Sequence, residues 1–261
     1  MKQDDFTRGS VSGKPGKLLS NARLHLILWG EYWQAKASEV TRNKVTSVLK
    51  ELAKSKYVKD ALAEYGIKAP PQFDGSWLVV RGPKRFKDEP VKFKRRMESF
   101  PSDHDSSDVV RWIQKLLAPG GEGEALQPDS NALYMVVMAP GAAATMRGTL
   151  GQHGFFYWPL KGKTRRRIHY AWATGVPHFS RNSEAKQDPR RKELYDNFVE
   201  TLSEELLEAC TDPEPYSGWT RDRLEICDDA EKVHHASIKV DGELVRAAAY
   251  CSRKGGVFLP L

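Results

Sequence analysis

Residues 190–210 of this 261-residue chain read RRKELYDNFVETLSEELLEAC. Apolar residues recur in it at every fourth position: Leu194, Phe198, Leu202, Leu206 and Cys210. This spacing, with acidic residues in between, predicts one long amphipathic helix. The helix is expected to end at Thr211-Asp212-Pro213, because the residue before a proline is disfavoured in helical conformation.

Three acidic residues, Glu204, Glu208 and Asp212, stand four residues apart on the same segment. In a helix, positions four apart are separated by only about 40°, so the three side chains share one edge. Like charges at this spacing repel each other, and the helix dipole opposes acids near the C-terminal end. Helix stability therefore does not favour this pattern. Two interpretations remain open: a solvated acidic face, or an edge that binds a cation.

The spacing of these acids is also that of the active helix of a metallopeptidase. In H-E-x-x-H, the residues at i and i+4 bind one metal and the glutamate at i+1 is the general base. Here these three positions are Glu204, Glu208 and Glu205, respectively. Spacing alone does not choose between this interpretation and a solvated face, because acids are common on helices.

The remaining pattern alternates between strands and helices, which predicts an α/β fold. Apolar runs predict strands at 23–29, 76–81, 132–139 and 168–174. Apolar residues at helical spacing predict a helical region over 37–65 and a helix from about 105–108 to 117. Residues 237–240 and 244–250 predict a closing hairpin around Asp241-Gly242. No strand is predicted within the small, glycine-containing segment 142–154.

Composition indicates a globular protein, with 40% hydrophobic and 29% charged residues. We expect a flexible polar arm over residues 1–21 and a single domain over 22–261. The first residues lack the apolar core of a secretion signal, and no apolar run is long enough to cross a bilayer, so a cytoplasmic protein is expected. The cysteines Cys210, Cys227 and Cys251 are odd in number and without C-x-x-C spacing, which favours free thiols.

The formal net charge is +7, and the basic residues are concentrated at 84–96 and 161–167, which includes Arg165, Arg166 and Arg167. Such clusters can bind phosphates or nucleic acid. Aromatic residues are sparse within them, which favours solvated loops over a nucleic-acid interface. Nucleic acid is therefore the weakest of the partners considered.

Several segments resemble known families. SEELLEACTDP at 203–213, GW at 218–219 and EIxD at 225–228 are similar to S-H-E-L-x-E-A-x-T-D-P, G-W and E-I-x-D in a bacterial group of zincin-like proteins. LHLILWGEYW at 24–33, NALYMVVM at 131–138, GQHG at 151–154 and YAW at 170–172 resemble the phosphate-induced, EXORDIUM-like family. The similarity extends over most of residues 22–230, and the helix motif is its specific part.

The resemblance implies a zincin-like mixed sheet in which strand 168–174 runs beside a long active-site helix. Carried over residue by residue, it makes Glu205 the general base and Glu208 a metal ligand. Asp212 and His153 are further candidate ligands, and Glu225 and Asp228 either complete the site or support the ligands from behind. His234 and His235 are weaker candidates.

This chain departs from the pattern at one position: Glu204 stands where the zincin-like proteins have their first metal-binding histidine. Catalytic zinc usually has an imidazole ligand, whereas carboxylates favour harder ions such as Mn²⁺. The expected cofactor is therefore zinc or manganese, with a metal-free form as the alternative. The expected function is a metallohydrolase of peptidase type, in which a metal-activated water reacts with help from a glutamate base. The alternative is a catalytically inactive binding protein for a peptide or an anionic partner.

Overall fold

A computed structural model describes ten segments of the chain: residues 17–79, 108–119, 126–144, 149–160, 164–177, 179, 189–214, 217–220, 224–228 and 235–252. It also describes five two-residue strands, namely β1 (Thr7–Arg8), β2 (Ser10–Val11), β3 (Lys14–Pro15), β6 (Lys92–Phe93) and β15 (Val257–Phe258).

The centre of the molecule is a five-stranded mixed sheet in the order β5-β4-β7-β10-β9. Four strands are parallel, and only β9, at one edge, runs antiparallel to its neighbour β10. The strands are β4 (Arg23–Trp29), β5 (Gln72–Val79), β7 (Ala132–Met138), β9 (Gly151–Pro159) and β10 (Arg165–Ala173). The mixed sheet with helices confirms the α/β class expected from the sequence.

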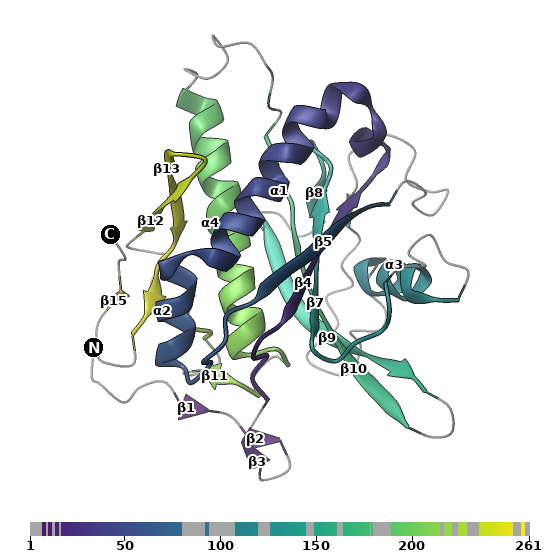
Figure 1. The fold of residues 1–261 in the computed structure, drawn as a ribbon, viewed down its shortest axis with the longest axis vertical. Coiled ribbons are helices and arrows are strands. Elements are labelled where there is room, and N and C mark those ends of the chain that lie inside the picture. The colour runs from purple at the N-terminus through teal and green to yellow at the C-terminus, as the bar shows by residue number, and fades with distance from the viewer. Residues whose placement is uncertain are drawn as a thin grey trace.

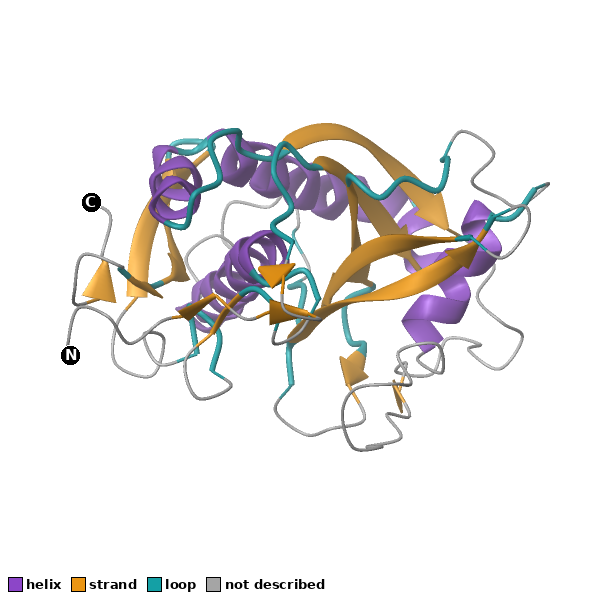
Figure 2. Ribbon diagram, turned by 90° about the horizontal axis from the view of Figure 1, so that it is seen from below, coloured by secondary structure: helices purple, strands orange, loops and turns teal. Residues whose placement is uncertain are grey.

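Both faces of the sheet are covered, which explains why β7 consists entirely of apolar residues that are all buried. Leu133, Met135 and Val137 of β7 face a core formed with α1 (Glu39–Lys54), α2 (Lys56–Glu64) and α4 (Pro189–Thr211). Tyr134 and Val136 face the opposite core, which includes α3 (Asp108–Leu117). Figures 1 and 2 show the helices on the two sides of the twisted sheet.

The helix α4 ends at Thr211, as its sequence pattern predicts. Two other predictions differ in detail. The helical region 37–65 is divided at Ser55, whose hydroxyl accepts a hydrogen bond from Val58 N at 3.1 Å and starts α2. The strand expected to begin at 76 begins at Gln72, across an irregularity in the pairing near Gly75.

The strand β9 was not predicted at all. Its first four residues are Gly-Gln-His-Gly, and its burial does not alternate regularly, so the segment lacks the period of two that identifies a half-buried strand. In the structure its register with β10 fixes its position, because nine consecutive residues pair from Gly151 opposite Ala173 to Pro159 opposite Arg165. This missed strand carries His153.

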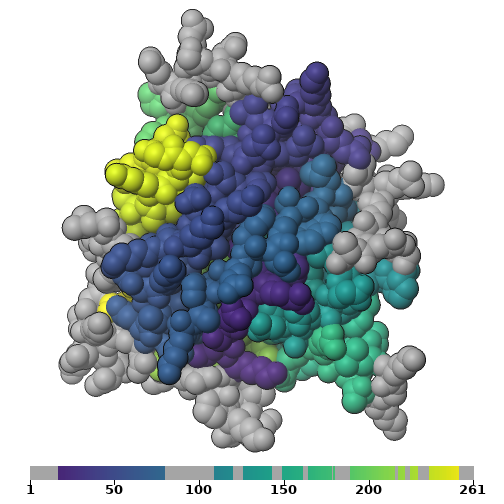
Figure 3. All heavy atoms as spheres, in the orientation of Figure 1, coloured from purple at the N-terminus to yellow at the C-terminus, as the bar shows by residue number. Residues whose placement is uncertain are grey.

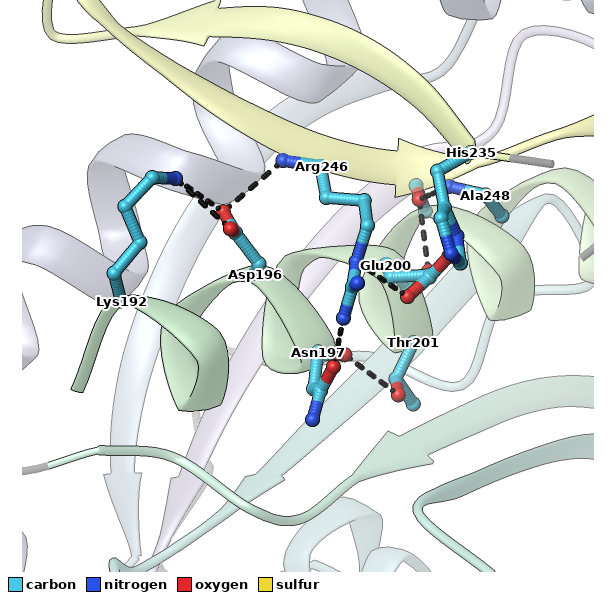
Figure 4. A network of polar contacts seen from close by, with 9 residues as sticks. Lys192, Asp196, Asn197, Glu200, Thr201, His235, Arg246 and Ala248 are labelled. Carbon is cyan, nitrogen blue, oxygen red and sulfur yellow. Dashed lines mark hydrogen bonds and ion pairs between the residues drawn. The ribbon is translucent and has the colours of Figure 1, made fainter. Parts of the chain in front are cut away.

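The hairpin of β12 (His235–Val240) and β13 (Glu243–Ala248) lies on the outer side of α4 and beside α1 (Figures 1 and 3). A polar network fixes it there (Figure 4). Arg246 Nε lies 3.0 Å from Glu200 Oε2, and His235 Nδ1 contacts the other oxygen of Glu200. Ala248 N donates to Ser203 Oγ at 2.8 Å. The predicted hairpin is thus present, and it is attached to α4.

Part of the segment expected to be a flexible polar arm belongs to the folded protein. Leu19 is buried, and its N–H donates to the carbonyl oxygen of Cys210 at 2.9 Å. Further upstream, β1 pairs with β11 (Trp219–Thr220). The remaining strands, β8 (Ala143–Ala144) and β14 (Tyr250–Cys251), pair with β6 and β15. Cys210, Cys227 and Cys251 are all free and buried, as expected. In the described part of the chain, no helix combines the length and apolar character needed to cross a bilayer.

Candidate metal centre

The acidic edge of α4 faces the protein interior. Glu205 is 5% exposed, Glu208 is 3% exposed, and Asp212 is fully buried. Glu204 is half-buried. The helix packs on β9 and β10, so these acids lie against the sheet and not in bulk solvent. A solvated acidic face, one of the two interpretations of the sequence, does not describe Glu205 and Glu208.

His153 of β9 lies at the middle of this acidic group and is only 4% exposed. Its Nδ1 is 3.2 Å from Glu205 Oε2. Its Nε2 is 3.1 Å from the carbonyl oxygen of Asp212 and 3.3 Å from Glu225 Oε1. One imidazole of β9 therefore contacts α4 at Glu205, the backbone just after α4 at Asp212, and the segment 224–228 at Glu225.

The acids alter the protonation of this histidine and of each other. Burial alone would lower the pKa of His153, but Glu225 and Glu205 outweigh it and raise the pKa well above 6.5. Burial would raise the pKa of Glu225, but the charge and hydrogen bond of His153 lower it below 4.5. Burial, followed by the charges of Glu225 and Glu204, raises the pKa of Glu208 well above 4.5. Without a bound cation, Glu208 therefore holds a proton more readily than Glu225.

Two overlapping groups of ligand atoms arise from this arrangement. The first comprises His153, Glu208 and Glu225, and the second comprises Glu204, Glu208 and Asp228. Within each group, one possible ligand atom per residue lies within 4.8 Å of the others. Glu208 belongs to both. The first group includes an imidazole and fits a divalent transition metal, whereas the second consists of carboxylates alone.

Backbone contacts hold the segment 224–228 against α4. Cys227 N donates to Glu208 Oε1 at 3.1 Å, and Glu225 N donates to Asp228 Oδ2 at 2.6 Å. Cys251 N donates to the carbonyl oxygen of Ile226 at 2.8 Å, which fixes the same turn from the other side. These bonds bring Glu225 into the first ligand group, although the sequence suggested it equally as a support behind the ligands.

Asp212, a candidate ligand from the sequence, lies outside both groups. Its Oδ1 accepts hydrogen bonds from Ser217 N at 3.0 Å and Gly218 N at 2.5 Å. A Cβ at Gly218 would overlap the carbonyl oxygen of Thr211, so only glycine fits there. In this arrangement Asp212 holds the backbone of Ser217 and Gly218 close to the end of α4.

A pocket of about 280 Å³ opens beside Glu204 and Glu205, between α4 and the start of β9. Gly151 forms part of its wall, and the sequence pattern did not indicate a specific role for this glycine. A Cβ at Gly151 would lie 2.6 Å from Glu205 Oε1 and 2.6 Å from Thr201 Cγ2. The glycine therefore lets the Glu205 side chain lie against the strand. A larger groove of about 830 Å³ lies elsewhere, between α1, the first turns of α4 and the hairpin.

The basic residues singled out in the sequence are engaged within the protein. Arg167 Nε lies 3.1 Å from Glu214 Oε1, and Arg165 and Arg167 both lie over the ring of Tyr157. Arg166 donates to the carbonyl oxygen of Pro128. Most of the basic stretch 84–96, residues 161–163 and His234 lie outside the described residues. His235 contacts Glu200 and takes no part in either ligand group.

Comparisons of the chain with models of protein families, with curated proteins and with solved structures found no match.

Proposed function

We propose that this protein is a metal-dependent hydrolase of zincin type that acts on peptide bonds, with a divalent cation held by His153, Glu208 and Glu225. One observation carries the proposal: an imidazole and two carboxylates from β9, α4 and the segment 224–228 converge within 4.8 Å in the protein interior. Buried charges are costly unless they are paired or bind a metal. A group in which acids outnumber the nearby histidine is a favourable environment for a cation.

The donor set determines which metal to test. One imidazole with two carboxylates fits Zn²⁺, and its oxygen-rich character also fits Mn²⁺. When bound, such an ion supplies Lewis acidity, which polarises a carbonyl group and makes water more acidic. His153 would have to release its proton to bind it, so metal binding and protonation compete at this side chain.

Glu205 is the residue of this chain that would move a proton. Its Oε2 is oriented by His153 at 3.2 Å, and the side chain also borders the pocket of about 280 Å³. A carboxylate in this position can accept a proton from a water molecule in the pocket and later donate it to a leaving amine. The resemblance assigns the same role to Glu205.

Metal binding tests the ligand set directly. Protein purified without chelators is expected to contain about one Mn²⁺ or Zn²⁺ per chain, and the metal-free protein to bind either ion in calorimetric titration. Glu208→Gln and Glu225→Gln should each weaken binding at least tenfold, because each removes one of three ligands. Glu51→Gln, on α1 and outside both ligand groups, is the matched control and should bind as the unaltered protein does.

Glu205→Gln separates catalysis from metal binding. It should retain the metal while hydrolysis of a peptide library falls roughly 100- to 10,000-fold, the usual contribution of general acid–base catalysis. Peptide hydrolysis unaffected by Glu205→Gln would contradict the assigned base. The absence of metal binding to the unaltered protein would contradict the whole proposal.

A second candidate is a non-catalytic protein that binds a peptide or an anionic partner. It is favoured by the contacts of His153, because both ring nitrogens are already within hydrogen-bonding distance of Glu205, Asp212 and Glu225 without a metal. Glu204 also favours this second function, because the zincin-like proteins have a metal-binding histidine at that position. Under this function the buried charges form an ion-pair network, and the melting temperature of the protein should not respond to added Zn²⁺ or Mn²⁺.

A further inference from the structure

The groove between α1, the start of α4 and the β12–β13 hairpin lies outside the candidate metal centre (Figure 1). Its volume of about 830 Å³ falls within the range of sites that hold a small organic molecule, roughly 300–1,000 Å³. None of the described residues in its wall belongs to either group of metal-ligand atoms. The groove is therefore a separate cavity with a lining of its own.

Contacts between the three surrounding elements fix the shape of the groove. Lys44 Nζ of α1 lies 3.3 Å from a carboxylate oxygen of Asp241 and 3.3 Å from one of Glu243, which joins α1 to the hairpin. Lys192 Nζ of α4 donates to the carbonyl oxygen of Leu244 at 3.3 Å, which joins α4 to the same hairpin. Small-molecule sites are usually largely pre-formed, and the walls of this groove are joined in this way before any ligand binds.

The charged side chains of the wall are engaged within the protein. Lys44 lies between the two acids of the hairpin, and Lys192 Nζ lies 2.8 Å from Asp196 Oδ2 on α4 (Figure 4). Glu39 and Arg191 also have contacts of their own. Among the described lining residues, acids and bases are equal in number, with three of each. An ionic ligand would have to compete with these contacts, so the lining favours a ligand without net charge.

The apolar part of the wall comes from all three elements and from one further residue: Val40, Phe179, Tyr195, Leu244 and Val245. Leu244 is 60% exposed, more than any other large hydrophobic residue in the described part of the chain. The rings of Phe179 and Tyr195 meet edge to face, with centroids 5.2 Å apart. An aromatic group in the groove would cover Leu244 and add to these ring contacts, and both effects favour its binding.

Tyr195 supplies a second observation that indicates a ligand. The residue is only 5% exposed, and its hydroxyl has no hydrogen-bond partner among the described residues. Buried hydroxyls are usually hydrogen-bonded, because an unpaired one is costly. Burial, followed by the charges of Glu243 and Asp241, raises the pKa of this hydroxyl above 10, so it stays protonated and can donate. Both acids line the groove, so the hydroxyl lies beside this space.

We infer that the groove binds a small neutral aromatic amide. The aromatic ring would lie against Phe179 and Leu244, and the carbonyl oxygen would accept a hydrogen bond from the Tyr195 hydroxyl. Asn43, an exposed residue of α1 at the same groove, has a side-chain amide that can both donate to and accept from the amide of the ligand. This binding site does not depend on the proposed hydrolase function.

Three probes of similar shape and different charge test the inference: phenylacetamide, phenylacetate and phenethylammonium. Each is titrated into protein that is isotope-labelled at its leucine and valine methyl groups, and NMR follows the titration. Phenylacetamide should shift the methyl resonances of Val40, Leu244 and Val245, and should bind about tenfold more tightly than either ion. Equal or tighter binding of an ion would overturn the inference. The absence of these shifts at up to about 10 mM phenylacetamide would also overturn it.

Tyr195→Phe removes the hydroxyl and keeps the ring. It should weaken phenylacetamide binding about fivefold, because the carbonyl oxygen loses its donor. The melting temperature should not fall, because the hydroxyl has no partner among the described residues of the free protein. Unchanged phenylacetamide binding would overturn the inference. A lower melting temperature would show that the hydroxyl has a partner within the protein, and would overturn it as well.

A pair of exposed leucines tests whether the probe binds in the groove. Leu244 and Leu194 are 60% and 50% exposed, and of the two only Leu244 is among the described lining residues. Leu244→Ala should weaken phenylacetamide binding about threefold, because less apolar surface is covered. Leu194→Ala is the matched control and should leave binding unchanged. An equal effect of the two substitutions would place the probe outside the groove and overturn the inference.

The tests of the groove and of the metal centre are separable, because the two sites share no described residue. Phenylacetamide binding by a protein that binds neither Mn²⁺ nor Zn²⁺ would refute the hydrolase and support the amide site. Metal binding without phenylacetamide binding would overturn the amide site alone.

Discussion

Gly151 is the residue where the smallest change should have the largest effect on the site. A methyl group there would lie 2.6 Å from Glu205 Oε1, so Gly151→Ala must displace the Glu205 side chain. We expect the free energy of unfolding to fall by about 1–3 kcal/mol, as for other overpacked sites, and any hydrolysis that depends on Glu205 to fall with it. Urea denaturation and a peptide assay measure the two effects.

Gly154→Ala, on the same strand, is the matched control for that substitution. Its Cβ would meet only the end of the Tyr170 side chain, at 3.2 Å or more. Its cost should stay below about 1 kcal/mol. Similar losses in the two variants would show that glycine is needed for the strand itself and not for the position of Glu205.

His169 of β10 predicts a pH dependence from a residue outside both ligand groups. Burial, followed by the charges of Lys17 and Arg167, lowers its pKa to about 4. Above pH 6.5 the imidazole is neutral in both the folded and the unfolded protein. As the pH falls below 6.5 only the unfolded chain takes up the proton, so stability is lost down to about pH 4.

The size of that loss follows from the shift. From 6.5 to about 4 it amounts to about 3 kcal/mol at one residue. His169→Gln removes the titrating group, so its free energy of unfolding should depend less on pH over this window. Urea denaturation at pH 7 and pH 4.5 measures the difference between the two proteins. Parallel pH profiles would show that His169 is protonated in the folded state.

At the scale of elements, α4 and the β12–β13 hairpin are joined by Arg246. Its guanidinium contacts Glu200 and Asn197, and its backbone N–H donates to Asp196 Oδ1 at 3.2 Å. Arg246→Met keeps the aliphatic stem but removes the guanidinium, and the Glu200 carboxylate keeps its contact with His235. We expect a loss of about 1.5–3 kcal/mol in urea denaturation, the usual range for a hydrogen bond to a charged group.

Lys239→Met, on the exposed side of β12, is the control for Arg246→Met and should change stability by less than about 0.5 kcal/mol. An effect as large as that of Arg246→Met would mean that the loss of a positive charge, and not the contact with α4, destabilises the protein.

The elements differ in how far the sequence could predict them. The helix α4 was predicted to within a residue at each end, because its apolar residues keep one spacing over five turns and Pro213 follows. The strand β9 was not predicted, because Gly151 and Gly154 interrupt the alternation of apolar and polar residues that identifies a strand. Its clearest signal is the aromatic run Phe155–Trp158, whose residues favour strands.

The site was predictable in its chemistry and not in its geometry. Helical spacing brings Glu204 and Glu208 to one edge whatever the tertiary fold. No local rule relates Glu225 to Glu208, because α4 ends at Thr211 and Glu225 lies beyond it. The partners of His153 likewise depend on the register between β9 and β10. The roles of Glu225 and Asp212 therefore depend on the tertiary structure.

At the scale of the whole molecule, the question is whether the scaffold has the zincin arrangement, and Glu204→His tests it. In that arrangement, residues 204 and 208 face one ion. The Glu204 and Glu208 side chains share a ligand group with Asp228 in this protein. Replacing a carboxylate by an imidazole should raise the affinity for Zn²⁺ at least tenfold and shift the preference from Mn²⁺ towards Zn²⁺. Glu193→His, at an exposed position near the start of the same helix, adds an imidazole far from Glu208 and should leave zinc affinity unchanged. If the zinc affinity rises equally in both variants, or in neither, then the acids of α4 are not arranged as in a zincin helix. The proposed peptidase function would then lose its structural basis.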